Sequence, residues 1–360
     1  MITLSPQEIS GRKNRLTKLW LDKSSPDLAV EFHYYTDNIQ RLGSPADRYA
    51  FNLEFIEKNS EYPGVYVPVY LPWFGATFQP EFFGAETIIS QEGGQPWAKP
   101  LIIDNPGDVY RIKLREPTDV PVFRKLQAEV EYVRRNFPDL PVRLHAVGGP
   151  LDTCCQLWKE EKFYLAMYDH PVEVEYLLEY VTEGIIQTLK WQMDIISGPV
   201  TLTWPMVWAP LQAGVGISED QLAVCSPDLY RKYVLKHLNR ISRAFNGLTI
   251  HSCGNFEHNL ANLAQVEHLN GLNFSICQNG SFRQGTQIER VVKYLPDTVL
   301  LPAFTYQGQD RFPAYVNYVE HVIEQTQGKN RVILTVEPHV IDTSELNRTM
   351  GALDEYQVGI

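Results

Sequence analysis

Short apolar runs recur along the chain, and most of them are followed by a stretch whose apolar residues return every three or four positions. Each run is too short for a typical helix and carries few charges, which predicts strands that are buried on both faces. The predicted strands cover residues 29–33, 66–70, 141–147, 200–203, 248–251, 272–276, 299–303 and 332–336.

Amphipathic helices are predicted between these strands. The clearest begins at Pro171, which suits a first helical position, and ends before Gly198. Others are expected within residues 5–21, after Ser226-Pro227 and over residues 315–327. Strands that alternate with helices indicate a parallel sheet, and this number of strands suits a (β/α)8 TIM barrel.

The predicted domain organisation is one barrel over residues 1–360, with long loops. Residues 1–60 would form a helical N-terminal extension and the first strand. The alternative is an open doubly wound sheet, which is less favoured because no glycine-rich phosphate loop follows the first strand.

Residues 195–218 carry no charge and are numerous enough to cross a membrane. Pro199, Pro205 and Pro210 would interrupt a membrane helix, so we expect a buried strand that runs into a long loop.

Composition narrows the class of protein. Of the 360 residues, 44% are hydrophobic and 21% are charged, which excludes a disordered chain. The net charge of −11 disfavours nucleic acid as a partner, and five cysteines are too few for a disulfide scaffold. Without a visible signal, transit or membrane segment, we expect a soluble cytoplasmic protein with reduced thiols.

The strongest chemical signal is the sequence His251-Ser252-Cys253-Gly254-Asn255, directly after an apolar run. Alternate residues of a strand point the same way, so the imidazole and the thiol can face one point. Both are natural zinc ligands, and the carboxyl ends of barrel strands are where active sites lie. The alternative is a buried cysteine beside a satisfied histidine.

A catalytic zinc site normally has three protein ligands. Cys277, which follows the next predicted strand, is one candidate for the third, and Glu337 and His339 after the last strand are others. We expect the remaining cysteines, at positions 154, 155 and 225, to serve in packing.

Aromatic and acidic residues also follow the predicted strands. An aromatic-lined pocket for a small-molecule substrate is expected if these loops converge, with a contribution from Asn255. The main candidates are His33, Tyr35, Trp73, Trp204 and Trp208. Glu219 and Asp220, before the helix at Ser226, could supply a catalytic general base, although a bare acidic pair is also typical of a solvated surface.

Beginning at residues 251–255, the chain resembles the uroporphyrinogen decarboxylase-like superfamily, and most of all its zinc-dependent methyltransferase branch. Three further stretches are similar to family segments, namely residues 149–157, 167–183 and 216–235. The resemblance is strong over about residues 145–265 and weak over the first 60 or so.

The resemblance implies a (β/α)8 barrel in which a His-x-Cys pair and a later cysteine hold zinc. Zinc would keep a thiol substrate such as coenzyme M as a thiolate, and the thiolate would take a methyl group from a corrinoid on a partner protein. His251 and Cys253 match this motif. The position of the later cysteine holds Glu337-Pro338-His339 instead.

Two other functions stay open. A metal-independent decarboxylase of a tetrapyrrole or small carboxylic acid would need arginines to bind carboxylates, and the N-terminal arginine signature of that branch is not visible. A non-catalytic protein that binds a corrinoid or tetrapyrrole would explain the replaced ligand. The sequence also leaves open whether the protein forms a homodimer.

Overall fold

A computed structural model describes residues 4–24, 26–34, 44–75, 77–88, 97–99, 103, 105–196, 207–276, 285–304, 312–339, 341–356 and 358. Strands in this part are β1 (Leu28–Phe32), β2 (Glu86–Ile88), β3 (Trp97–Lys99), β4 (Val215–Ser218), β5 (Leu248–Ser252), β6 (Leu269–Ile276), β7 (Val299–Phe304) and β8 (Arg331–Val336). Its α-helices are α1 (Pro6–Leu21), α2 (Pro45–Ser60), α3 (Phe78–Phe82), α4 (Pro121–Asn136), α5 (Pro150–Trp158), α6 (Glu160–Asp169), α7 (Pro171–Ile195), α8 (Pro227–Leu229), α9 (Leu235–Phe245), α10 (Leu260–Leu263), α11 (Ile288–Tyr294), α12 (Tyr315–Thr326) and α13 (Thr343–Glu355).

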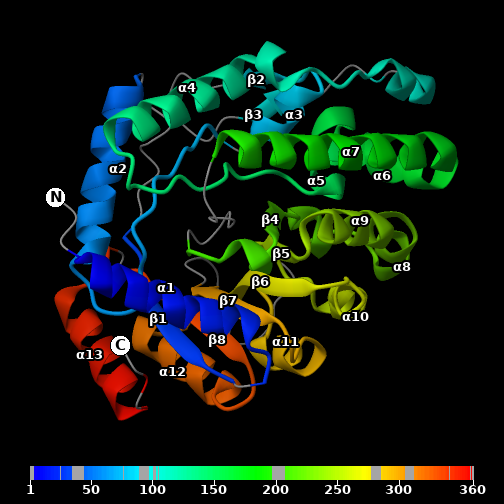
Figure 1. Ribbon diagram of the computed structural model, residues 1–360. Helices are drawn as coiled ribbons and strands as arrows, with labels where there is room; N and C mark the ends of the chain where they lie inside the picture. Colours follow the sequence, from blue (N-terminus) through cyan, green and yellow to red (C-terminus); the bar gives the residue numbers. More distant parts are fainter. Residues whose placement is uncertain are drawn as a thin grey trace.

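Six strands form a parallel sheet in the order β1-β8-β7-β6-β5-β4 (Figure 1). Two extended segments, residues 64–70 and 141–149, complete the ring between β1 and β4. The N–H of Val65 donates to the Val30 carbonyl oxygen at 2.9 Å, and the N–H of Tyr70 donates to Pro141 at 2.8 Å. On the other side, the N–H of Ser218 donates to Val147 at 3.0 Å. The chain therefore forms the predicted (β/α)8 barrel.

Alternation along the strands creates two apolar cores. In β1, Val30 and Phe32 point outward and pack against the surrounding helices. Ala29 points into the barrel, where Val65, Val299 and other interior residues surround it. One set of strand residues faces the helices and the other faces the barrel interior, which explains why these runs are apolar at almost every position.

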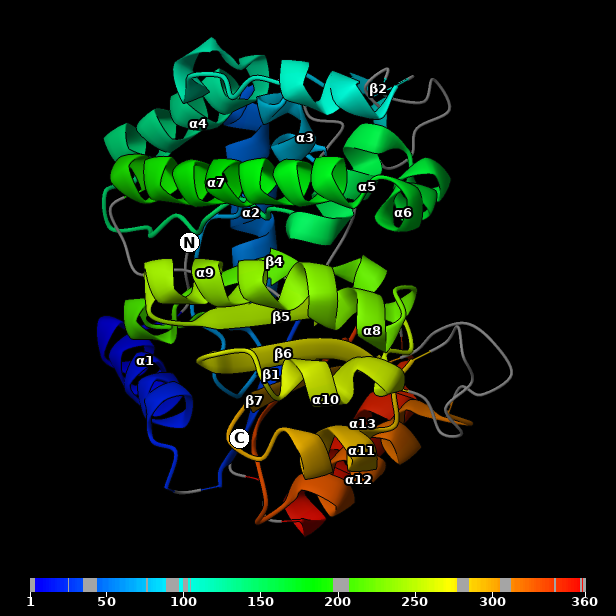
Figure 2. The same cartoon turned by 90° about the vertical axis from the view of Figure 1, so that its right-hand side faces the viewer.

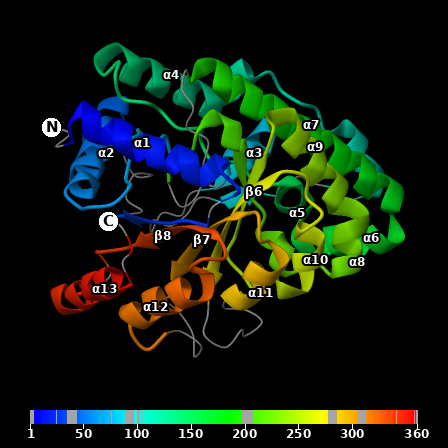
Figure 3. The same cartoon turned by 60° about the horizontal axis from the view of Figure 1, so that its bottom comes forward.

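Helix α1 closes the end of the barrel where the strands begin (Figure 3). Trp20 packs with the interior core and donates its indole N–H to the Trp208 carbonyl oxygen at 3.2 Å. Arg331, the first residue of β8, donates to the carbonyl oxygens of Leu19 and Trp20 at 3.0 and 2.7 Å. Helix α1 is thus the floor of the barrel.

The helices predicted from periodicity are confirmed. Helix α7 begins at Pro171 as expected, and α12 covers Tyr315–Thr326. The helix after Ser226 starts as α8, continues through a π-helical turn at Tyr230–Val234 and ends as α9. Figure 2 shows α7 and α9 lying side by side, and Arg240 of α9 forms ion pairs with two glutamates of α7.

The uncharged stretch is organised differently from the prediction. Ile195 is the last residue of α7, and Val215–Ser218, expected within a long loop, is the barrel strand β4. Gly214 precedes β4 with φ of +86°, and a Cβ there would lie 2.0 Å from the Gly247 carbonyl oxygen, so only glycine lets β4 approach β5. The predicted strand at 200–203 lies outside the described residues. None of the described helices combines the length and apolar character that a membrane span requires.

Candidate metal centre

The site lies where β5 ends. Leu248 and Ile250 pack against the outer helices, so the alternating His251 faces the barrel interior. Cys253 follows two positions later, and its Sγ lies 3.0 Å from Nε2 of His251. A Cβ at Gly254 would lie 2.5 Å from Cβ of Ala223, so glycine permits the tight turn that follows. The predicted convergence of the imidazole and the thiol is confirmed.

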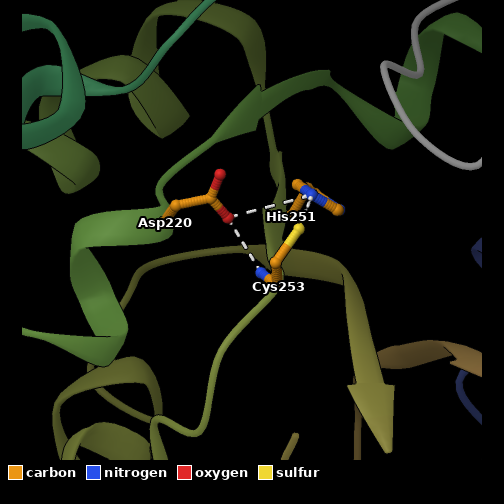
Figure 4. Close-up of side chains that lie close together, drawn as sticks. All are labelled: Asp220, His251 and Cys253. Atoms are coloured by element: carbon orange, nitrogen blue, oxygen red, sulfur yellow. Dashed lines mark hydrogen bonds and ion pairs between the residues drawn. The ribbon is translucent and has the colours of Figure 1, made fainter. Parts of the chain in front are cut away.

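Asp220 supplies a third donor atom beside this pair (Figure 4). It lies two residues after the end of β4, and its Oδ1 is 3.9 Å from Nε2 of His251. The same Oδ1 accepts the N–H of Cys253 at 2.8 Å. One ligand atom from each of the three residues lies within 4.8 Å of the others. The sequence predicted Asp220 as a general base; the structure brings it into a group with metal-ligand chemistry.

Asn273 of β6 orients the imidazole. Its Nδ2 donates to the Leu301 carbonyl oxygen at 2.6 Å, which directs its Oδ1 to accept from Nδ1 of His251. Nδ1 therefore carries the proton, and the lone pair of Nε2 faces Cys253 and Asp220. A histidine ligand with its second nitrogen held in this way is typical of metal sites.

The donor set fits a zinc ion. In tetrahedral zinc sites a histidine nitrogen and a cysteine sulfur lie about 3.5 Å apart, and a nitrogen and a carboxylate oxygen about 3.3 Å. The corresponding separations of 3.0 Å and 3.9 Å need shifts of only about half an ångström to match these values. Desolvation and the neighbouring Asp220 carboxylate raise the pKa of the Cys253 thiol, so a thiolate at neutral pH needs a nearby cation.

Two buried carboxyl groups lie behind Asp220. Asp152 is 8% exposed and Glu219 is fully buried. Glu219 accepts the N–H of Leu151 at 3.1 Å through Oε1, while Oε2 has no hydrogen-bond partner among the described residues. Burial raises the pKa of both groups. The Asp220 carboxylate raises the pKa of Asp152 further, and Asp152 does the same to Glu219. Glu219, predicted as a base, thus belongs to the support of the site rather than to its exposed surface.

The structure separates the predicted substrate-binding residues. His33 is buried at the end of β1, and half-buried Trp73 stacks on His145 with ring centroids 5.4 Å apart, both near the carboxyl ends of the strands. Trp208 packs in the interior core against α1 at the floor, which corrects the prediction that it lines the mouth. Asn255 accepts the N–H of Glu257 at 3.0 Å and stabilises the turn after the motif.

The other candidates for the third metal ligand lie away from His251 and Cys253 or outside the described residues. Glu337 follows β8, three strands from β5 in the sheet order, and is outside the group formed by His251, Cys253 and Asp220. His339 packs against Tyr34 with ring centroids 5.3 Å apart. The predictions for Cys277, Tyr35 and Trp204 concern residues outside the described ranges.

The other cysteines behave as expected. Cys154, Cys155 and Cys225 are buried in the outer core, whereas Cys253 is exposed.

Sequence reasoning missed Asn273 and Asp152. A signal existed for Asn273, because a polar residue inside an apolar strand run has to find a partner in the barrel interior. Asp152 follows Gly149-Pro150 in the first turn of α5, where an acidic residue is unremarkable by itself. Its partners lie 68 and 69 positions away, so no local pattern reveals them.

The fold and the site define a (β/α)8-barrel protein whose candidate metal centre lies at the carboxyl ends of the strands. The sequence model of the family uroporphyrinogen decarboxylase (URO-D) matches residues 71–278, more than half of the chain. The protein therefore belongs to the uroporphyrinogen decarboxylase family.

Among solved structures, the chain is similar to a methyltransferase from Methanosarcina mazei, with 16% identity and a TM-score of 0.61. The match covers 96% of this chain and 99% of that one, and at this identity it supports the fold. A match to SrfJ from Salmonella typhimurium is weaker, with 12% identity, a TM-score of 0.36 and coverage of 87% of this chain and 67% of that one. No curated protein matches the chain.

Proposed function

We propose that this member of the family is a zinc-dependent methyltransferase that moves a methyl group between a corrinoid and a thiol. The observation that carries the proposal is the convergence of Nε2 of His251, Sγ of Cys253 and Oδ1 of Asp220. These three residues would hold the metal. When bound, zinc would supply the positive charge that keeps a substrate thiol in its thiolate form at neutral pH.

The residues of this chain have separate tasks in this proposal. Asn273 fixes the tautomer of His251, so the imidazole presents Nε2 toward Cys253. The Cys253 N–H holds Oδ1 of Asp220 beside the pair. Three protein ligands are the usual number in a catalytic zinc site, which keeps one position for the substrate.

The donor set supports methyl transfer, and the methyltransferase from Methanosarcina mazei, which is similar in fold, is consistent with it. The corrinoid would arrive on a partner protein. We assign it the role of methyl donor because a small thiol is the natural fourth ligand of a zinc ion held by nitrogen, sulfur and oxygen.

Metal analysis of the purified protein tests the proposal. We expect about one zinc per chain in the wild type and a large loss in His251→Ala and Cys253→Ser. His258→Ala is the matched control, because His258 lies on the same segment and contacts the Cys225 carbonyl oxygen at 3.1 Å. The reaction is then tested with methylcobalamin and a panel of thiols. Demethylation of methylcobalamin is monitored by the change in its absorbance. Wild-type protein that stays free of zinc after supplementation would refute the proposal.

Metal-independent decarboxylation is the second candidate, because the matched family is named for a decarboxylase. Arg48 lies beside the loop after the second barrel segment, but its guanidinium is committed to the Trp73 carbonyl oxygen at 2.8 Å and to buried Glu129 at 3.5 Å. Release of carbon dioxide from a carboxylic acid, unchanged by a chelator, would favour this function. Tight retention of a corrinoid without turnover would favour a binding protein.

A further inference from the structure

A buried carboxylate fixes the backbone that carries Asp220. Oδ2 of Asp152 accepts the N–H of Asp220 at 2.9 Å, and its Oδ1 accepts the N–H of Gln221 at 2.8 Å. One side chain therefore binds two successive peptide groups. Neither peptide can rotate without breaking a hydrogen bond to this buried side chain. The Asp220 carboxyl group can therefore move only by rotation about its own side-chain bonds.

The neighbouring residues are fixed in the same way. The N–H of Glu219 donates to the His251 carbonyl oxygen at 2.8 Å, which ties the segment to β5. Tyr164 donates its hydroxyl hydrogen to Oε1 of Gln221 at 2.8 Å. A Cβ at Gly149 would lie 1.6 Å from Oε2 of Glu219, so glycine is required for α5 to approach this segment.

The orientation of Asp152 argues against an ordinary helix-capping role. An acidic residue in the first turn of a helix usually stabilises the free N–H groups of its own helix. Both oxygens of Asp152 instead accept from a segment about 70 residues later in the chain. The carboxylate thus joins α5 to the end of β4.

We propose that Asp152 is a positioning residue for the metal centre: through the backbone of residues 220 and 221 it holds the Asp220 carboxylate beside His251 and Cys253. The inference rests on the proposed function, because it requires that a cation binds there. In this chain the end of β8 carries Glu337 in place of the expected cysteine. The inference explains how a residue after β4 can serve as the third ligand instead.

Zinc affinity, measured by competition with a chromophoric chelator, tests this role in Asp152→Asn. The amide keeps the size of the side chain and one acceptor, but cannot accept both N–H groups. We expect a loss of affinity of about 10- to 100-fold, the usual effect of removing an outer-shell partner. The absorption spectrum of the cobalt(II)-substituted protein should change as well, which a purely structural role would not cause.

Two controls separate positioning from other effects. Asp342→Asn removes a carboxylate that accepts the Glu345 N–H at 2.8 Å at the start of α13, far along the chain from the site. Glu160→Gln removes a negative charge near Asp152 without touching residues 219–221. We expect both to keep wild-type affinity within about two-fold, since long-range charge effects are screened.

If Asp152→Asn does not fold, Asp152→Glu tests the same contacts, because it keeps the carboxyl group and moves it by one methylene relative to the N–H groups of Asp220 and Gln221. We expect a loss of zinc affinity of about two- to five-fold. Unchanged zinc affinity in a folded Asp152 variant would overturn the inference, and so would an equal loss of affinity in Glu160→Gln. In both cases zinc binding by the wild type would still support the proposed function. A wild type that binds no zinc would refute both.

Discussion

Asn273 offers the most direct test of how the site is organised. It is fully buried on β6 and makes two contacts, from Nδ2 to the Leu301 carbonyl oxygen and from Oδ1 to Nδ1 of His251. Asn273→Ala removes both. The imidazole then loses the group that sets its tautomer and orientation.

The expected magnitudes follow from these contacts. A buried polar group that loses its partner costs about 1–3 kcal/mol, and two groups are affected, so we expect a loss of about 2–6 kcal/mol in the free energy of unfolding. Loss of an outer-shell partner of a histidine ligand weakens metal binding about 10- to 100-fold, or about 1.4–2.8 kcal/mol. Urea unfolding of the zinc-free protein measures the first effect, and chelator competition measures the second.

Asn273→Asp separates the two contacts. The carboxylate still accepts from His251, as in carboxylate–histidine–zinc arrangements, but no longer donates to Leu301. We expect zinc affinity close to that of the wild type, with the stability loss retained. The matched control is Asn262→Ala, because Asn262 is equally buried and donates to the Pro227 carbonyl oxygen at 2.9 Å. Equal zinc affinity in Asn273→Ala, Asn262→Ala and the wild type would refute the orienting role.

Three further predictions concern the barrel. Gly214→Ala should destabilise the protein by about 3 kcal/mol or more in urea unfolding, because it adds a Cβ at positive φ against Gly247; a loss below about 1 kcal/mol would contradict this. Burial raises the pKa of Glu129 to about 7, above its unfolded value, so stability should fall by at most about 3 kcal/mol as pH rises from about 4 to 7. Glu129→Gln should remove this slope, and an unchanged slope would contradict it. Arg331→Met should lower the free energy of unfolding by about 3 kcal/mol and speed hydrogen exchange in α1, because it removes the hydrogen bonds to Leu19 and Trp20. Unchanged exchange would show that α1 is held by packing alone.

The barrel was predictable because its strands are buried on both faces and its helices are amphipathic. Both properties leave a periodic trace in the sequence, which gave the starts of α7 and α12 and most strands. Strand β4 left a weak trace, since Val215–Ser218 is only four residues long and contains a glycine. The sequence pattern therefore predicts a loop there.

The same short strand explains why the role of Asp220 was not predicted. A residue after a barrel strand faces the mouth, but the sequence pattern does not indicate a strand before Asp220. His251 and Cys253 were predictable because their strand is clear and their spacing is local. Asn273 and Asp152 act across strands and helices, and such pairings are set by the tertiary fold.

The pairing of β1 with β8 has a consequence for how the protein is made. Leu28 pairs with Val332, so the partner of the first strand is synthesised about 300 residues later in the chain. Until β8 leaves the ribosome, one edge of β1 and the interior face at Ala29 remain without their final cover. Closure is therefore a late event in biosynthesis, and the nascent chain is an expected client of chaperones that shield strand edges.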